Sequence, residues 1–173
     1  MSQIQTLSID QVDPAPAIDV IVEASGWPDA GQLQALVKSA TQAIFTSVEC
    51  TILPDSELSI VFSDDTRVRD LNDRYRGKEG ATNVLSFPGD STHDDAFGPM
   101  IGDVILALET VANEAGTSGQ PLTHHMTHLV IHGILHLLGY DHQTPPEAEI
   151  MEQLETRLLE QLGIADPYPE DPA

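Results

Sequence analysis

The chain has 173 residues, of which 40% are hydrophobic and 20% charged, as expected for one globular domain with a substantial core. Its formal net charge is −21, with seven Lys and Arg against 28 Asp and Glu, so the chain as a whole is poorly suited to non-specific binding of nucleic acid. A single cysteine, Cys50, excludes an internal disulfide, and the absence of a long apolar run argues against a membrane partner.

The predicted elements begin after a polar leader. Residues 1–16 are expected to be flexible, and they lack the basic start and apolar centre of a signal peptide, so we expect a cytoplasmic protein. Residues 17–24 alternate and are rich in β-branched side chains, which predicts a strand. Apolar residues at helical spacing predict a helix over residues 29–47. A second strand is predicted over residues 57–63, followed by a helix over residues 66–75.

The middle of the chain predicts two more strands, over residues 83–87 and 100–108. Asp103 lies inside the apolar run of the second of these, where a carboxylate needs a partner. It can either orient a histidine of a metal site or accept backbone hydrogen bonds, and both interpretations stay open. A short helix over residues 109–115 precedes a long helix that begins at Pro121.

The end of the chain predicts one further helix. Thr144 begins a T-P-P-E segment that is typical of a capped helix start, and Gly163 is expected to end the helix. Its predicted core face repeats every four residues, at Ile150, Leu154, Leu158 and Leu162. The acidic tail over residues 165–173 is expected to be disordered. The prediction is an α/β (α+β) fold in a single domain over residues 17–164, with one small mixed four-stranded sheet covered by about five helices.

The few cations of the chain are concentrated in one window. Five of the seven lie there, namely Arg67, Arg69, Arg74, Arg76 and Lys78. One interpretation is a solvated helix face with ion pairs between residues four apart. The other is a local phosphate site on an otherwise repelling surface, and composition alone does not separate the two.

Three histidines follow the spacing H-x3-H-x5-H, at His132, His136 and His142. The first two are four apart in an apolar run, so on a helix they share one face. Gly139 is the residue type that most readily ends a helix in a left-handed turn, which can bring His142 back towards the pair. Three converging imidazoles with an open fourth position are typical of a catalytic zinc site on a core helix and the turn after it, although nickel, iron or copper also suit them.

The residue after the first histidine separates this motif from that of zinc peptidases. In H-E-x-x-H enzymes a glutamate in that position is the general base, whereas this chain has Gly133. The spacing still resembles that of metzincin peptidases, so a peptidase remains an alternative that Gly133 disfavours. Another hydrolysis at the metal, with charge stabilisation supplied from elsewhere in the chain, is favoured.

In three segments the chain resembles the YbeY family of bacterial single-strand-specific endoribonucleases and rRNA maturation factors. Residues 71–78 resemble its L-N-x-x-Y-R-x-K segment, residues 82–88 its T-[DN]-V-L-S-F-P segment, and residues 132–142 its H-G-x-L-H-L-x-G-Y-D-H signature. The G-D at residues 102–103 fits the start of the family's fourth strand. The resemblance covers residues 58–162, and the first fifty residues resemble the family only in pattern.

The resemblance implies specific roles. His132, His136 and His142 match the family's ligands for one metal ion, usually Zn²⁺, and Arg76 matches an arginine that is catalytic or contacts RNA. His132 and Arg76 are therefore the expected catalytic residues of the domain. The implied substrate is single-stranded rRNA, particularly the 3′ end of the small-subunit RNA, with a role in ribosome quality control and with ribosomal particles and assembly proteins as partners.

Two questions stay open at this point. The attacking group can be a hydroxide generated at the metal or a ribose 2′-hydroxyl. The chain can also be a ribosome-assembly binding factor with a structural metal and little nuclease activity, an alternative that its acidic composition favours.

Overall fold

The computed structural model describes residues 4–9, 15–77, 82–89 and 96–168. Within these residues, five strands form one mixed sheet and two short strands form a separate pair. In spatial order the sheet contains β1 (Gln5–Ile9), β2 (Ala17–Val22), β4 (Glu57–Ser63), β7 (Met100–Ala107) and β5 (Val84–Pro88). The separate pair is β3 (Thr51–Ile52) and β6 (Ala96–Phe97). The three central strands β2, β4 and β7 are parallel, and β1 and β5 are antiparallel edges.

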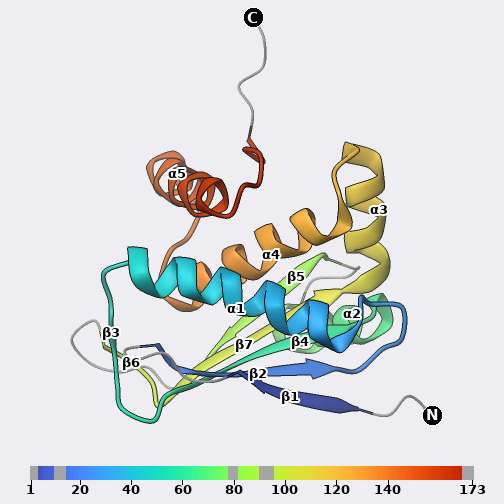
Figure 1. Cartoon of the computed structure of the whole chain (residues 1–173), viewed down its shortest axis with the longest axis horizontal. Helices are drawn as coiled ribbons and strands as arrows, with labels where there is room; N and C mark the ends of the chain where they lie inside the picture. Colours follow the sequence, from blue (N-terminus) through green and yellow to red (C-terminus); the bar gives the residue numbers. More distant parts are fainter. Residues whose placement is uncertain (1–3, 10–14, 78–81, 90–95, 169–173) are drawn as a thin grey trace, which may run out of the picture.

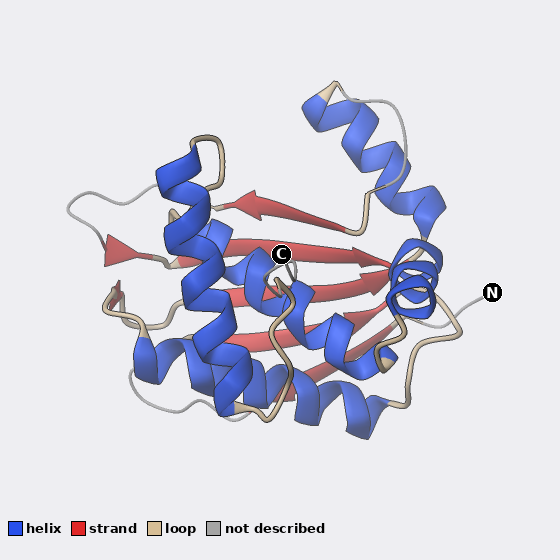
Figure 2. Cartoon of the chain, turned by 90° about the horizontal axis from the view of Figure 1, so that it is seen from above, coloured by secondary structure: helices blue, strands red, loops and turns tan. Residues whose placement is uncertain are grey.

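Helices cover both faces of the sheet unequally. They are α1 (Ala30–Ser47), α2 (Asp65–Arg76), α3 (Leu108–Ser118), α4 (Leu122–Leu137) and α5 (Pro145–Gln161). Helices α1 and α4 lie on one face, and α5 lies on the outer side of α4, away from the sheet (Figure 1). Seen from above, the sheet lies beneath these helices (Figure 2). None of the described helices is long and apolar enough to cross a membrane.

Side chains alternate between the two faces of the sheet along each strand, and each face has its own hydrophobic core. Val104 and Leu106 of β7 are fully buried in the large core between the sheet and α1, α4 and α5. The small core lies on the opposite face, where Val68 and Leu71 of α2 pack near Leu85. Because neighbouring residues of a strand point to opposite faces, one strand serves both cores. The predicted mixed α/β architecture, with its five helices and the four strands β2, β4, β5 and β7, is confirmed.

Both expected chain ends differ from the structure. The prediction of a flexible leader over residues 1–16 is wrong for Gln5–Ile9, because these residues form β1, which pairs with β2 along its whole length as a fifth strand. The disorder expected over residues 165–173 is wrong for residues 165–168, where Asp166 accepts a hydrogen bond from Thr156 of α5. The remaining parts of the two predicted ends that lie outside the described residues are 1–3, 10–14 and 169–173.

Helix α4 packs tightly against the sheet at Gly133. A methyl group added there would lie 2.4 Å from Cγ1 of Val104 and 3.2 Å from the hydroxyl oxygen of Ser86. The buried Ser86 hydroxyl also donates a 2.8 Å hydrogen bond to the Gly133 carbonyl oxygen. Gly133 is therefore required by the packing of α4 on β5 and β7.

We expect Gly133→Ala to lower the free energy of unfolding by about 1–3 kcal/mol, because the methyl group overpacks a rigid β-branched neighbour. The matched control is Gly116→Ala in exposed α3, where nothing lies within 4 Å of the added methyl group. There the substitution should raise stability by about 0.5–1 kcal/mol, since only the conformational freedom of glycine is lost. Urea unfolding of both variants measures the difference. Equal effects at the two positions would contradict the packing argument.

Candidate active site

The three histidines of the motif lie where α4 ends. His132 and His136 project from its last two turns, and His142 follows in the next loop. Gly139 has φ +93°, and its N–H donates to the carbonyl oxygen of His136, which closes the helix in a left-handed turn. The predicted role of Gly139 as the end of the helix is confirmed. The turn reverses the chain, and His142 comes back beside the helical pair.

The three rings converge on one point. Nε2 of His132 lies 3.0 Å from Nε2 of His136. The ring of His142 is centred 5.6 Å from that of His132 and 5.0 Å from that of His136. One ligand nitrogen from each of the three lies within 4.8 Å of the other two. The structure thus brings together all three residues of the predicted metal site.

For His132 and His136, a hydrogen bond at Nδ1, on the side of the ring away from the site, decides which ring nitrogen carries the proton. Nδ1 of His132 lies 2.6 Å from Oε1 of Glu155, and Nδ1 of His136 lies 2.9 Å from the carbonyl oxygen of Tyr140. A carboxylate and a carbonyl oxygen only accept, so both Nδ1 atoms donate. When both rings are neutral, the two Nε2 lone pairs are then left facing each other at 3.0 Å, and neither has a proton to donate to the other. A cation between them satisfies both, so these residues fit a metal ion.

The electrostatic setting of His136 agrees with that fit. Burial lowers the pKa of His136, and the neighbouring His132 and His142 lower it further, while the bond to Tyr140 and the charge of Asp141 act in the opposite direction. A lowered pKa keeps the imidazole neutral at neutral pH. The neutral ring is the form that binds a metal ion.

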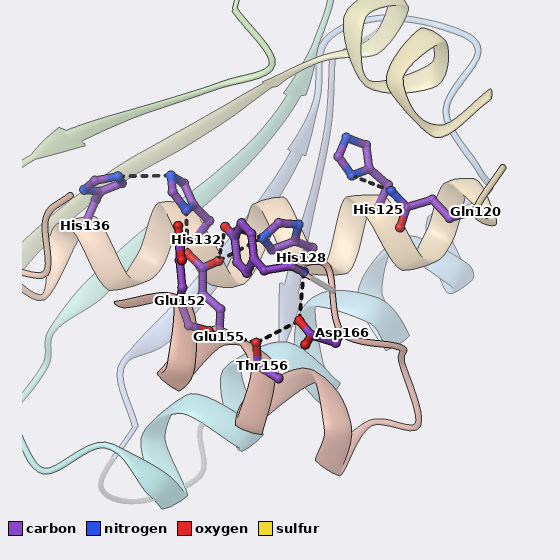
Figure 3. A network of polar contacts seen from close by, with 10 residues as sticks. Gln120, His125, His128, His132, His136, Glu152, Glu155, Thr156 and Asp166 are labelled. Atoms are coloured by element: carbon purple, nitrogen blue, oxygen red, sulfur yellow. Dashed lines mark hydrogen bonds and ion pairs between the residues drawn. The ribbon is translucent and has the colours of Figure 1, made fainter. Parts of the chain in front are cut away.

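The carboxylate that contacts the site is Glu155 of α5, and sequence reasoning missed it. Its side chain is fully buried and reaches across to His132 and His128 of α4 (Figure 3). Burial alone would raise the pKa of Glu155, but hydrogen bonds from His128, His132 and Tyr168 outweigh it and lower the pKa to about 2. Asp103, the carboxylate that the sequence offered as a partner for a metal-site histidine, is exposed on the face of the sheet that points away from α4.

Arg76 is the last residue of α2 and is tied to the strand beside the metal helix. Its Nη2 donates a 3.0 Å hydrogen bond to the carbonyl oxygen of Ser86 in β5. The same Ser86 holds Gly133 of α4 through its hydroxyl group. Two hydrogen bonds therefore connect the arginine to the helix that carries His132 and His136.

Arg76 and the three histidines line one cavity of about 630 Å³. Asn83 and Ser86 of the neighbouring loop and strand line it as well. The other cations of the window behave differently, since Arg67 and Arg74 pair with Asp70 on the exposed face of α2, at 3.8 and 3.2 Å. Arg67 and Arg74 therefore fit the interpretation of a solvated helix face with ion pairs, whereas Arg76 lies in the cavity and Lys78 lies outside the described residues.

The chain is similar to known proteins over most of its length. A family model described as "Endoribonuclease YbeY" matches residues 24–163. A protein of that name from Rhodopseudomonas palustris is 46% identical over 156 residues, which cover 88% of this chain and 90% of the relative. One from Sinorhizobium fredii is 45% identical over 161 residues, covering 90% of this chain and 93% of the relative.

A solved structure shares the fold at lower identity. The solution structure of a protein from Thermotoga maritima superposes with a TM-score of 0.53 and 20% sequence identity. The match covers 88% of this chain and 99% of that one. At this identity the likeness shows the fold alone.

Proposed function

The chain belongs to the YbeY endoribonuclease family, and from that membership and the geometry of the cavity we propose that it is a metal-dependent endoribonuclease acting on single-stranded RNA. The observation that carries the proposal is the shared cavity, in which Arg76 lies with the three convergent histidines. We propose that residues 17–164 form its single catalytic domain. This function requires both a metal ion and a cation that binds phosphate, and the cavity offers residues for each.

We further propose rRNA as the substrate, particularly the 3′ end of the small-subunit RNA, on the likeness of the three sequence motifs. The protein would act in the cytoplasm on ribosomal particles and with assembly proteins. A net charge of −21 supports dependence on such partners, because long-range attraction for free RNA is absent. Recognition then rests on short-range contacts inside the cavity.

His132, His136 and His142 would hold the metal ion, each through one ring nitrogen. Zinc is the first candidate, because three neutral imidazoles are a common ligand set for catalytic zinc. When bound, the ion supplies Lewis acidity for phosphodiester hydrolysis. Glu155 and the Tyr140 carbonyl oxygen hold the His132 and His136 rings with Nε2 directed at the site.

Arg76 would bind the scissile phosphate. Its guanidinium has five N–H donors, and the hydrogen bond to the Ser86 carbonyl oxygen engages one end of that fork, at Nη2. The planar group can therefore bind phosphate oxygens and stabilise the charge that develops on them. Gly133 has no side chain to accept a proton, so the geometry supports phosphodiester cleavage better than the general-base chemistry of zinc peptidases.

The test of the proposed function is cleavage of an end-labelled single-stranded rRNA fragment by purified protein, with the same sequence as a duplex for comparison. We expect cleavage of the single strand that stops when a chelator removes the metal. A 2′,3′-cyclic phosphate end would identify attack by the ribose 2′-hydroxyl, whereas a 5′-phosphate with a free 3′-hydroxyl would exclude it. Metal-loaded protein that cleaves no RNA would overturn the proposal in favour of an assembly factor.

Metal removal should also destabilise the fold, since the candidate ligands lie on the core helix α4 and the turn after it. A ligand at about 100 times its Kd stabilises the native state by about 2.7 kcal/mol. We expect the melting temperature to fall when a chelator strips zinc-loaded protein, and to recover when zinc is added back. His136→Ala is the control and should melt at the same temperature with and without zinc. An unchanged melting temperature after demonstrated metal loss contradicts the prediction.

A further inference from the structure

Glu155 is a fully buried carboxylate that joins three separate parts of the chain. Its Oε1 accepts from Nδ1 of His132 at 2.6 Å. Its Oε2 accepts from Nε2 of His128 at 2.9 Å and from the hydroxyl group of Tyr168 at 2.6 Å. Each oxygen therefore has its own donors, and the orientation of the carboxylate is set independently of His132.

Tyr168 belongs to the segment that follows α5 and folds back along it. Asp166 anchors this segment, because its Oδ1 accepts from the Thr156 hydroxyl at 3.1 Å and from the Tyr168 N–H at 2.8 Å. The Tyr168 ring packs edge-on against His128, with centroids 5.5 Å apart and planes at 89°. The position of its hydroxyl group is thus defined by contacts other than the bond to Glu155.

The same residues do not suit a second metal site. His128, His132 and Glu155 are close enough to be considered as a ligand group. However, both contacts join a ring nitrogen to a carboxylate oxygen that accepts a hydrogen bond, so they are satisfied without a metal ion, and the 2.6 Å separation is well short of the about 3.3 Å between two ligands of one tetrahedral zinc. A metal at Nδ1 of His132 would also displace the proton that leaves Nε2 free for the three-histidine site.

We propose that Tyr168 and His128 fix the Glu155 carboxylate, and that Glu155 in turn holds His132 as the Nδ1–H tautomer with its ring directed at the metal. Glu155 and Tyr168 are therefore positioning residues. This inference rests on the proposed function only in taking His132 as a metal ligand. Partners of this kind commonly contribute a factor of about 10–100 to metal affinity, because they set both the tautomer and the direction of the ligand ring.

Glu155→Gln tests the first part, with metal affinity measured on the full chain by zinc competition against a chromogenic chelator. Glutamine keeps the size of the side chain, but it has one acceptor oxygen in place of two, so it cannot accept both from His132 and from His128 and Tyr168. We expect zinc affinity to fall about 10–100-fold. The control is Glu160→Gln, the same change at an exposed position of α5, which should leave the affinity unaltered. Equal affinity of Glu155→Gln and wild type would overturn the proposal.

Tyr168→Phe tests the second part without disturbing the core, because Tyr168 is 37% exposed. It should weaken zinc binding in the same direction by less than Glu155→Gln. The ¹⁵N chemical shifts of His132 in metal-free protein provide a readout that fold stability alone does not move. We expect the Nδ1–H tautomer in wild type and a mixture in Glu155→Gln. A mixture of His132 tautomers in wild type would overturn this proposal and leave the nuclease function standing. If wild type instead shows the Nδ1–H tautomer but cleaves no RNA, the nuclease function is overturned and this proposal stands.

Discussion

Replacing His136 with alanine should reduce RNA cleavage at least about a thousandfold, because the site loses a ligand and with it several kcal/mol of Lewis-acid stabilisation. The remaining His132 and His142 provide two nitrogens, too few for a stable three-ligand site. Bound zinc, measured on the purified variant, should fall in parallel with the rate. The two losses together would place the chemistry at this group of histidines.

The control is His124→Ala, which makes the same change on the first turn of α4, away from the site. It should retain both zinc and activity. Cleavage that persists unchanged in His136→Ala would contradict the assignment and indicate a contaminating nuclease or a different catalytic centre. Circular dichroism of both variants separates a local loss of metal from unfolding.

Arg76→Ala should lower kcat about 10²–10³-fold, the usual cost of removing a donor that stabilises developing charge. Zinc content should be unchanged, because Arg76 contacts Ser86 and none of the three histidines in the described hydrogen bonds. Single-turnover cleavage of the labelled RNA measures the rate of the chemical step. Loss of rate without loss of metal distinguishes this variant from His136→Ala.

Arg74→Ala is the matched control, since it removes a cation two residues away on the same helix. The Arg74 side chain is 66% exposed and pairs with Asp70, outside the cavity. We expect it to change the rate less than about threefold, as for an exposed ion pair. Similar losses in both variants would show that the cationic window acts through general attraction. Arg76→Lys should restore only part of the rate, because an ammonium cannot bind two phosphate oxygens in the planar arrangement of a guanidinium.

The candidate site could be predicted from the sequence to the extent that it is local. His132, His136 and His142 span eleven residues, so helix geometry and one left-handed glycine are enough to bring them together. Arg76 is more than fifty residues away, and its place in the same cavity depends on how β5 lies beside α4. Spacing could not provide that information. The cation window included this arginine among five candidates, and the family resemblance singled it out.

Sequence reasoning misses Glu155 because the predicted core face of α5 repeats every four residues and does not include position 155. Four residues turn a helix by about 400°, so such a row drifts around the helix by about 40° at each step. The buried face instead follows the i, i+3, i+4, i+7, i+8 pattern of an amphipathic helix, through Met151, Leu154, Glu155, Leu158 and Leu159, and Ile150 is 59% exposed. On that pattern Glu155 is the one charged residue among apolar residues, and this was the signal in the sequence that could have identified it.

Strand β1 was missed for a different reason. Its sequence, QTLSI, contains two apolar residues, too few for a distinct alternating pattern. It is an edge strand whose backbone pairs only with β2, so its formation depends mainly on that neighbour. The central strands each carry enough buried residues to be recognised alone.

The close contact of α4 with β7 also bears on how this active site can evolve. A glutamate at Gly133 would complete the H-E-x-x-H motif of a zinc peptidase, but Val104 occupies the space its first side-chain atom needs. A gene acquiring that mutation alone would encode a poorly folded protein before it encoded a new activity. The path to peptidase chemistry therefore passes through a change at the fully buried Val104 that makes room for the new side chain, and directed evolution libraries that vary Gly133 by itself should return no peptidases.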